Sequence, residues 1–297
     1  MTPSPHFGPV LTAMVTPLNA DHTVDWAKAA ALASHLVANG SDGLVVAGTT
    51  GESPTLSPAE KLKLFQVVLE AVGDRASVIA GTGSYDTAET IHLSREAEQV
   101  GVHGLLLVTP YYSRPPQEAL YQHYWAVAEA VKSPCILYNV PSRTAVNLAA
   151  PTTLRLAAHP NIVGIKECAD LGQLGEILRG APDDFTVWSG DDGMLLPFLS
   201  LGAYGIISVA AHLVGPKFQT LIRQFKAGDV TGAAQTHLAL LPLLKALFAT
   251  TNPIGVKAAL RLTGWDVGPL RLPLLSASPA EEEALRGALV EVGLLER

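Results

Sequence analysis

One short run, Asn161-Ile162-Val163-Gly164-Ile165-Lys166-Glu167, decides the fold. Its apolar residues suit both faces of an extended chain, which is typical of a strand in a parallel sheet covered by helices. Lys166 closes this strand, so its ammonium would lose hydration among apolar groups. Loss of hydration lowers the pKa of a lysine from its usual value of about 10.4. A neutral amine can then attack a ketone and form a Schiff base. The ordinary alternative is a lysine that reaches solvent or pairs with Glu52 or Glu167.

Similar apolar runs recur along the chain and alternate with segments of helical spacing. The predicted strands are Val10–Val15, Gly43–Val46, Val78–Ala80, Gly104–Val108, Cys135–Tyr138, Val163–Lys166, Phe185–Trp188 and Gly205–Ser208. The clearest helices between them are Trp26–Asn39, Pro58–Val72, Thr87–Val100 and Gln117–Val131. Strands that alternate with helices imply parallel crossover units, and eight such units in about 210 residues match a (β/α)8 TIM barrel. A doubly wound open sheet is the alternative, but no G-x-G-x-x-G turn or Walker A pattern occurs.

The alternation of strands and helices stops after Gly215. The helical segments that follow are Pro216–Ala227, Val230–Ala249, Gly255–Leu262 and Ala280–Val292. The sequence therefore predicts a (β/α)8 barrel over residues 1–215 and a C-terminal helical extension over residues 216–297 that packs on it.

The composition excludes several classes of protein. With 48% hydrophobic and 16% charged residues, the chain can bury a large core and is too apolar to be disordered. A net charge of −7 without a basic block argues against nucleic-acid binding. No apolar run reaches membrane-spanning length, and no signal segment stands at the N-terminus. The two cysteines, Cys135 and Cys168, fit a reduced thiol pair, so we expect a cytoplasmic protein.

Chemistry in such a barrel gathers at the C-terminal ends of the strands. The residues at those ends are Thr16-Pro17, Gly48–Ser53, Gly81–Gly83, Thr109–Tyr112, Tyr138–Thr144, Lys166-Glu167, Ser189–Asp192 and Ser208–Ala210. Hydroxyl groups, one arginine and one strand-borne lysine would thus converge on one face. The pair Asp191-Asp192 suits a helix cap better than a metal site, and the nine histidines are dispersed. We expect no metal.

Each cluster also has an ordinary interpretation. Gly48–Ser53 could be a plain turn before a helix cap, although its amides could equally hold a carboxylate. The pair Tyr111-Tyr112 could serve packing or oligomer contacts. Arg143 could form a surface ion pair, which is the commoner fate of arginine.

Five motifs, in order along the chain, resemble the dihydrodipicolinate synthase family of the N-acetylneuraminate lyase superfamily. They are Gly48–Ser53, Thr109–Tyr112, Tyr138–Thr144, Gly164–Glu167 and Ser189–Asp192. The resemblance runs from about Val10 to the segment Asn252–Lys257. Ala145 departs from the glycine that is common after Arg-Thr in the family.

The resemblance implies a lyase that condenses pyruvate with L-aspartate 4-semialdehyde to 4-hydroxy-tetrahydrodipicolinate, in lysine and diaminopimelate biosynthesis. Lys166 would form the Schiff base with pyruvate, and the covalent imine would make any metal or organic cofactor unnecessary. Tyr138, Thr49 and Tyr112 would relay protons, with Tyr112 reaching into a neighbouring protomer. The family is usually a homotetramer built as a dimer of dimers.

By the same resemblance, Thr50 would bind the pyruvate carboxylate, and the backbones of Gly190 and Ile207 would line the site. Arg143 would hold the carboxylate of the semialdehyde, a role that suits its bidentate geometry. A sibling aldolase of 2-keto-3-deoxy sugar acids could use Lys166 and Tyr138 equally well, and Arg143 discriminates against it. A non-catalytic barrel that binds a keto acid is the alternative from a different class.

The resemblance also generates a prediction about feedback control by lysine. Glu89 and Tyr111 match the possible allosteric site of the family. Enterobacterial members that respond to lysine carry two histidines and an asparagine where this chain has Pro58, Lys61 and Tyr85. A second cation at Lys61 would repel a lysine ligand. We therefore expect lysine to inhibit weakly or not at all in an assay of the purified protein, and inhibition at submillimolar lysine would contradict this.

Overall fold

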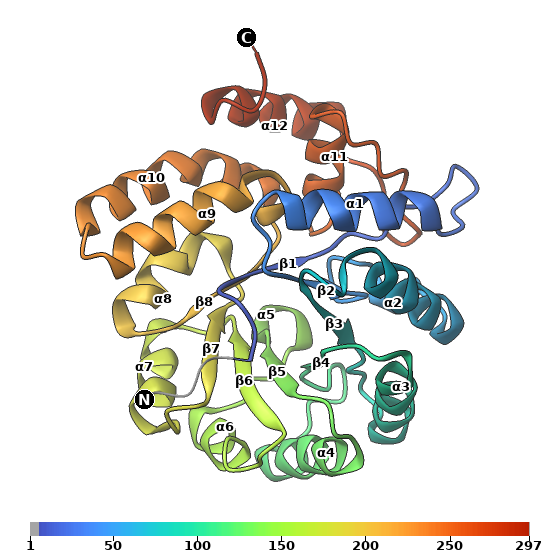
Figure 1. Ribbon diagram of the computed structural model, residues 1–297, viewed down its shortest axis with the longest axis vertical. Coiled ribbons are helices and arrows are strands. Elements are labelled where there is room, and N and C mark those ends of the chain that lie inside the picture. Colours follow the sequence, from blue (N-terminus) through green and yellow to red (C-terminus); the bar gives the residue numbers. More distant parts are fainter. Residues whose placement is uncertain (1–5, 297) are drawn as a thin grey trace.

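Eight parallel strands close into a barrel in the computed structural model, which describes residues 6–296 (Figure 1). The strands are β1 Val10–Ala13, β2 Gly43–Val46, β3 Ser77–Gly81, β4 Gly104–Val108, β5 Cys135–Asn139, β6 Ile162–Glu167, β7 Thr186–Ser189 and β8 Gly205–Ser208. Each strand pairs with its neighbours in sequence, and β8 pairs with β1 to close the ring. The predicted (β/α)8 barrel is confirmed.

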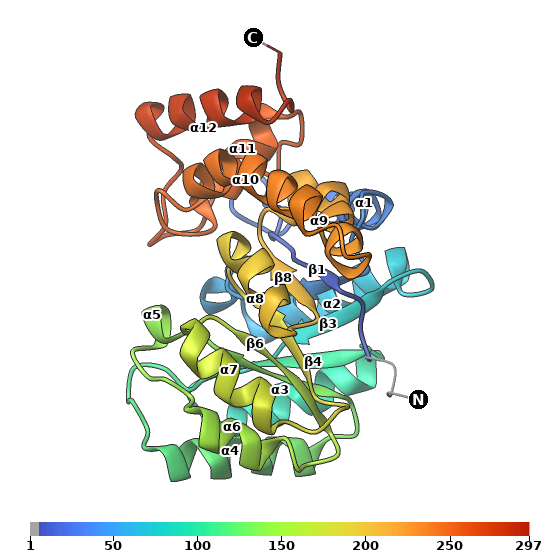
Figure 2. The same cartoon turned by 90° about the vertical axis from the view of Figure 1, so that its left-hand side faces the viewer.

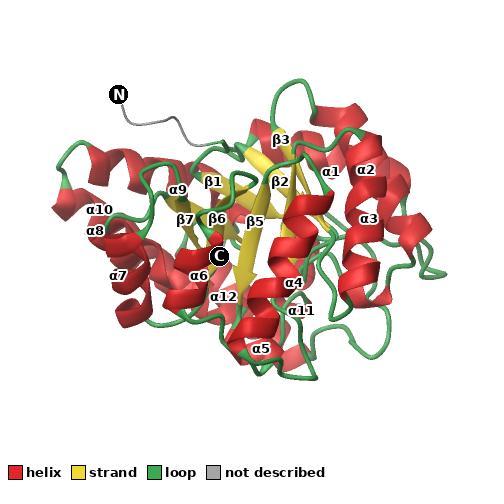
Figure 3. Ribbon diagram, turned by 90° about the horizontal axis from the view of Figure 1, so that it is seen from below, coloured by secondary structure: helices red, strands yellow, loops and turns green. Residues whose placement is uncertain are grey.

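Helices surround the strands (Figure 3). Around the barrel they are α1 Trp26–Ala38, α2 Pro58–Val72, α3 Thr87–Val100, α4 Gln117–Ala130, α5 Pro141–Thr144, α6 Ala150–Leu156, α7 Leu171–Gly180, α8 Leu195–Leu201 and α9 Ala211–Lys226. Local capping explains why several begin where they do. Asp25, Ser57 and Asp86 accept hydrogen bonds from free amides in the first turns of α1, α2 and α3. At the other end of α3, Gly101 adopts a left-handed conformation with φ of 95°.

Three further helices form the C-terminal extension: α10 Val230–Leu247, α11 Ile254–Leu262 and α12 Pro279–Glu291. Figure 2 shows them as a layer on one side of the barrel, with α12 furthest from the strands. α10 packs against α9 as well as against α11 and α12, so it joins the barrel to the extension. Within residues 6–296, every helix is too short or too polar to cross a membrane.

Many predicted boundaries differ by one or two residues from those of the structure, and the differences at β1 and α9 affect how the barrel closes. β1 ends two residues before the predicted Val15, because the Val15 amide bonds to His212 instead of to a neighbouring strand. α9 begins at Ala211 rather than at Pro216, and it has a kink at Val214. Proline has no amide to give and clashes with the preceding turn, which accounts for the kink. α9 packs against β1 and α1, so it takes the place of the eighth barrel helix. The border predicted at residue 215 falls inside it, and the division into two parts stays a prediction.

An irregularity between β5 and β6 decides which side chains face the barrel interior. Cys135 lies opposite Ile162, but Ile136 lies opposite Gly164, so β6 has one extra residue at Val163. Val163 belongs to the core inside the barrel, whereas Ile165 belongs to the layer between strands and helices. Strict alternation from Val163 would therefore turn Lys166 outward. The extra residue reverses this and sets Lys166 opposite Tyr138.

His212 fastens the closure of the barrel between β8 and β1. Its ring is buried, the Val15 amide donates to Nε2 at 3.1 Å, and Nδ1 lies 2.7 Å from the Val209 carbonyl. An amide can only donate and a carbonyl can only accept, so Nδ1 carries the proton and the ring is neutral. Burial lowers the pKa of His212 to about 4, although its bond to Val209 opposes the shift.

This pKa predicts a pH-dependent stability. The folded state binds fewer protons at His212 than the unfolded chain does, so the contribution is complete above pH 6.5 and is lost as the pH falls toward about 4. We expect the stability advantage of the wild type over His212→Gln to shrink by about 3 kcal/mol between pH 7.5 and pH 4. Urea unfolding at both pH values measures this difference, and an advantage that does not change with pH would contradict it.

Candidate active site

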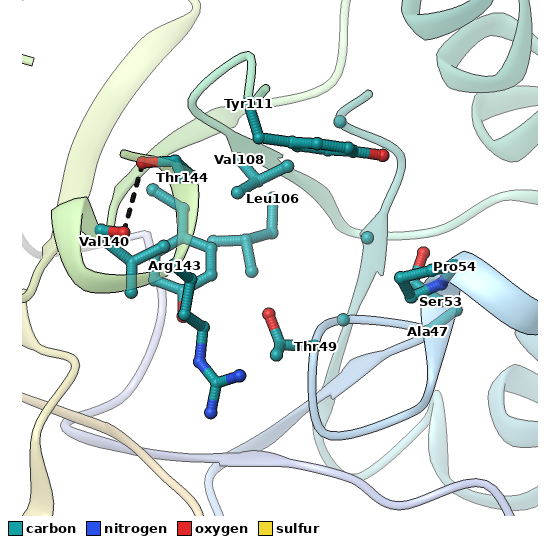
Figure 4. A pocket seen from close by; sticks show the side chains of 14 residues that line it. Ala47, Thr49, Ser53, Pro54, Leu106, Val108, Tyr111, Val140, Arg143 and Thr144 are labelled. Atoms are coloured by element: carbon teal, nitrogen blue, oxygen red, sulfur yellow. Dashed lines mark hydrogen bonds between the residues drawn. The ribbon is translucent and has the colours of Figure 1, made fainter. Parts of the chain in front are cut away.

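Two adjoining cavities open at the C-terminal ends of the strands, with volumes of about 540 and 230 Å³. Both are lined by Thr49, Tyr138, Val140 and Arg143, so they form one site with two lobes. The larger lobe adds Thr50, Lys166, Gly190 and Asn252 together with side chains of α10. The smaller lobe adds Ser53 and Tyr111. In Figure 4, Thr49 and Arg143 project into the smaller lobe from different segments, and the Tyr111 ring lies along its far side.

Lys166 lies on the floor of the larger lobe and is only 5% exposed. Its Nζ lies 4.3 Å from the centre of the Tyr138 ring. Burial lowers the pKa of Lys166, and the Asp192 carboxylate opposes the shift. The direction of this shift is the one predicted from the sequence. The alternative partners are engaged elsewhere, since Glu52 pairs with Lys257 and Glu167 accepts bonds from amides.

Tyr138 and Thr49 line the same lobe as Lys166, and each carries a hydroxyl group. Burial raises the pKa of the Tyr138 phenol, and its hydrogen bond with Thr49 partly opposes the shift. The phenol therefore keeps its proton at neutral pH and can donate it. Protons can pass between the cavity and Tyr138 through the Thr49 hydroxyl.

Arg143 projects from the short helix α5 that follows β5. Figure 3 shows β5 pointing toward α5, so this helix lies at the catalytic end of the barrel. Ala145 ends α5 in the left-handed region with φ of 58°, the position where the sequence departs from the family's glycine. The ion pairs formed within residues 6–296 do not include Arg143. Its guanidinium is thus free to bind a carboxylate in either lobe.

The turn Gly48–Ser53 carries Thr49 and Thr50 and is held by the C-terminal part of the chain. Asn252 Nδ2 donates to Thr50 Oγ1 at 2.9 Å, which leaves the Thr50 proton free to donate into the cavity. Glu52 adopts a left-handed conformation with φ of 57°. Its buried carboxylate lies 2.6 Å from Lys257 Nζ. Sequence reasoning missed Asn252 and Lys257 as site residues, although both lie in the segment where the family resemblance ends.

The remaining predicted residues differ in how they relate to the cavity. Gly190 lines it, and a Cβ there would lie 2.2 Å from Cys168 Sγ and 2.9 Å from Lys166 Cε, so only glycine leaves room for the lysine. Ile207 is buried inside the barrel and lines neither lobe. Tyr112 lines neither lobe either. Its side chain is 92% exposed and its backbone is left-handed, with φ of 71°.

The residues matched to lysine regulation lie next to the smaller lobe. Tyr85 packs edge-on against Tyr111 at 5.3 Å, and Glu89 accepts a bond from Ser84. Burial lowers the pKa of Lys61, and the charge of Glu89 opposes the shift. A lysine side chain of the protein therefore already lies within the electrostatic influence of Glu89.

Of the two aspartates after β7, Asp191 caps the short turn that follows, as the sequence indicated, whereas Asp192 bonds to the chain after β8. Asp191 accepts from the Gly193 amide, and buried Asp192 accepts from the amides of Val209 and Ala210. Within residues 6–296, no group of three histidine, cysteine or acidic side chains is arranged to hold a metal ion.

Comparison with known proteins places this geometry in a family. Residues 6–292 match the model of the dihydrodipicolinate synthetase family, DHDPS. The 4-hydroxy-tetrahydrodipicolinate synthase of Symbiobacterium thermophilum is 66% identical over 98% of this chain and 100% of its own. That of Moorella thermoacetica is 58% identical over 97% of this chain and 99% of its own. The crystal structure of lysine-bound DHDPS from Cyanidioschyzon merolae superimposes with a TM-score of 0.97 at 45% identity, covering 98% of this chain and 100% of that one.

The ion pair beneath the Thr49-Thr50 turn generates a stability prediction. Replacement of Lys257 by methionine would leave Glu52 buried without its counter-charge, a change that typically costs about 3–5 kcal/mol of unfolding free energy. We expect Lys257→Met to lose this amount in denaturant unfolding. The control Lys217→Met removes an exposed lysine that bonds only to the Val292 carbonyl and should change stability by less than about 1 kcal/mol. Equal stability of the two variants would contradict the prediction.

Proposed function

This chain belongs to the dihydrodipicolinate synthetase family, and we infer that its barrel condenses pyruvate with L-aspartate 4-semialdehyde to 4-hydroxy-tetrahydrodipicolinate. The reaction belongs to lysine and diaminopimelate biosynthesis, and it makes the protein an aldolase-type lyase. The observation that carries the mechanism is the buried Lys166, whose pKa is lowered, opposite Tyr138 in a cavity that also holds Thr50 and Arg143.

The first substrate is pyruvate. The Thr50 hydroxyl, oriented by Asn252, donates to its carboxylate together with amides of the same turn. The neutral amine of Lys166 attacks the ketone carbon, and Tyr138 supplies the proton with which the ketone oxygen leaves as water. The resulting iminium withdraws electrons, so the methyl group loses a proton to the deprotonated relay of Tyr138 and Thr49, and an enamine forms. The imine itself is the electron sink, and the proposed reaction therefore needs no metal or organic cofactor.

The second substrate binds through its carboxylate to Arg143. The enamine carbon attacks the aldehyde carbon, and the aldehyde oxygen takes a proton from the relay of Tyr138 and Thr49. The amine of the second substrate then attacks the imine carbon. This closes the ring and releases Lys166 as a free amine. One water molecule leaves overall, at the stage of imine formation.

Tyr112 completes the relay from a neighbouring protomer in this proposal. Its 92% exposure directs it away from its own cavity. Leucine side chains are also exposed on α7, α8 and α10, at Leu171, Leu201, Leu238 and Leu241. With Tyr112 shared between protomers, we propose the homotetramer that is usual in the family, a dimer of dimers. Native mass spectrometry counts the subunits, and a monomer would contradict the role of Tyr112.

We place the protein in the cytoplasm. Cys135 and Cys168 are free thiols, which suits a reducing compartment.

Trapping with borohydride tests the mechanism. After incubation with pyruvate and borohydride, we expect the intact chain to gain one reduced pyruvyl group on the peptide that contains Lys166. Lys166→Met should gain none. A folded wild-type protein without the adduct would contradict the Schiff base and favour the non-catalytic keto-acid barrel.

The variant Arg143→Ala tests how the second substrate binds, by trapping and by steady-state kinetics. It should still form the adduct, but its kcat/KM for the semialdehyde should fall about a hundredfold, because a bidentate charged contact is lost. Arg155→Ala is the control, since Arg155 is exposed and pairs with Glu118 on the outer helices. Unchanged use of the semialdehyde by Arg143→Ala would contradict the role of Arg143. A wild-type protein that forms the adduct but does not use the semialdehyde would point to a sibling aldolase.

A further inference from the structure

The residues that follow Tyr138 and Lys166 form a second pair on the outer side of the same two strands. Asn139 lies opposite Glu167 in the register of β5 and β6, directly after Tyr138 opposite Lys166. Successive side chains of a strand point to opposite faces, so this pair points away from the catalytic cavity. Asn139 and Glu167 are both fully buried. A buried carboxylate is costly, and the reaction described above makes no use of it.

The Glu167 carboxylate accepts three hydrogen bonds from N–H groups. Oε1 accepts from Asn139 Nδ2 at 2.9 Å and from the Ala169 amide at 2.7 Å. Oε2 accepts from Gln173 Nε2 at 3.0 Å. Only a group that accepts at both oxygens can satisfy these donors. A glutamine here would turn its own N–H toward one of them.

The partners of Glu167 hold the far end of the segment that carries Arg143. Asn139 accepts from the Leu148 amide at 2.9 Å and donates to Asn147 Oδ1 at 2.7 Å. Gln173 accepts from Asn147 Nδ2 at 2.7 Å and donates to the Leu148 carbonyl at 3.1 Å. The chain thus leaves this polar cluster at Asn139, passes through α5 with Arg143, and returns to the cluster at Asn147 and Leu148.

We propose that Glu167 is a positioning residue for the second substrate, because through Asn139 and Gln173 it clamps both ends of the segment that carries Arg143. Glu167 touches neither substrate. The clamp fixes where the exposed guanidinium lies relative to Lys166, the residue before Glu167 on β6. It therefore sets the affinity for the carboxylate of the semialdehyde. It does not affect the formation of the imine between Lys166 and pyruvate. The inference rests on the proposed function, in which Arg143 binds that carboxylate.

The variant Glu167→Gln tests the proposal. We expect KM for the semialdehyde to rise about tenfold, since one hydrogen bond of the clamp becomes a contact between two donors. We expect KM for pyruvate and the yield of borohydride-trapped adduct to stay within about twofold of the wild type. The pH dependence of adduct formation should have the same shape as in the wild type. If Glu167 had a purely structural role, its loss would raise KM for both substrates together. That result, or unchanged kinetics, would overturn the proposal.

Glu98→Gln is a matched control. Glu98 Oε1 also accepts three bonds, from the amides of Lys132 and Ser133 at 2.7 Å each and from Ser133 Oγ at 3.0 Å. It fixes the loop that precedes β5, at the end of the barrel away from the cavity. The same chemical change there should leave both KM values unaltered. A rise in KM for the semialdehyde equal to that in Glu167→Gln would overturn the proposal.

A double variant separates this inference from the proposed function. In the Arg143→Ala background, Glu167→Gln should raise KM for the semialdehyde no further, because the clamp acts through Arg143. A full additional rise would overturn the inference. If Arg143→Ala alone leaves KM unchanged, the proposed function of Arg143 fails first. Should Glu167→Gln not fold, Gln173→Ala removes one arm of the clamp from a half-buried position, and the same selective rise is expected.

Discussion

The register between β5 and β6 is the constraint on which the site depends. The extra residue at Val163 shifts the alternation of β6 and sets Lys166 opposite Tyr138 inside the barrel. The next step along both strands sets Asn139 opposite Glu167 outside it. One register therefore delivers two polar pairs, an inner pair that faces the cavity and an outer pair that holds the neighbouring loop. A slip by one residue would exchange these faces and bring the carboxylate where the amine is needed.

The pKa of Lys166 depends on two opposing effects of its surroundings, burial and the charge of Asp192. Burial favours the neutral amine, while Asp192 favours the ammonium. Burial also raises the pKa of Asp192 to about 6, although bonds from Ser208 and two amides resist the shift. The carboxylate thus stays largely ionised at neutral pH without a direct ion pair to the lysine. Its charge moderates the fall in the pKa of Lys166 and spares the lysine the full cost of burial.

The barrel, its strand ends and the cluster of Thr49, Tyr138, Arg143 and Lys166 could be predicted from sequence, because strand ends of parallel crossover units share one face. The extra residue at Val163 could not, since the run Ile162–Ile165 is apolar throughout and gives no sign of which face each residue takes. The early start of α9 was hidden by Pro216, which resembles a helix start but lies after a kink. The pair of Glu52 with Lys257 joins residues too far apart in sequence for any local pattern to connect them.

That distant pair changes how the C-terminal extension relates to the chemistry. Leu241 and Leu244 of α10, and Phe248 directly after it, line the larger lobe of the cavity. Beyond α10, Asn252 orients the Thr50 hydroxyl, and Lys257 neutralises the buried charge of Glu52 in the same turn. Without these contacts, the Thr50 hydroxyl would have no fixed direction and the Glu52 carboxylate would be buried without a counter-charge. The barrel supplies the reacting groups, and the C-terminal extension holds the carboxylate-binding turn in position. The two parts therefore build a single site.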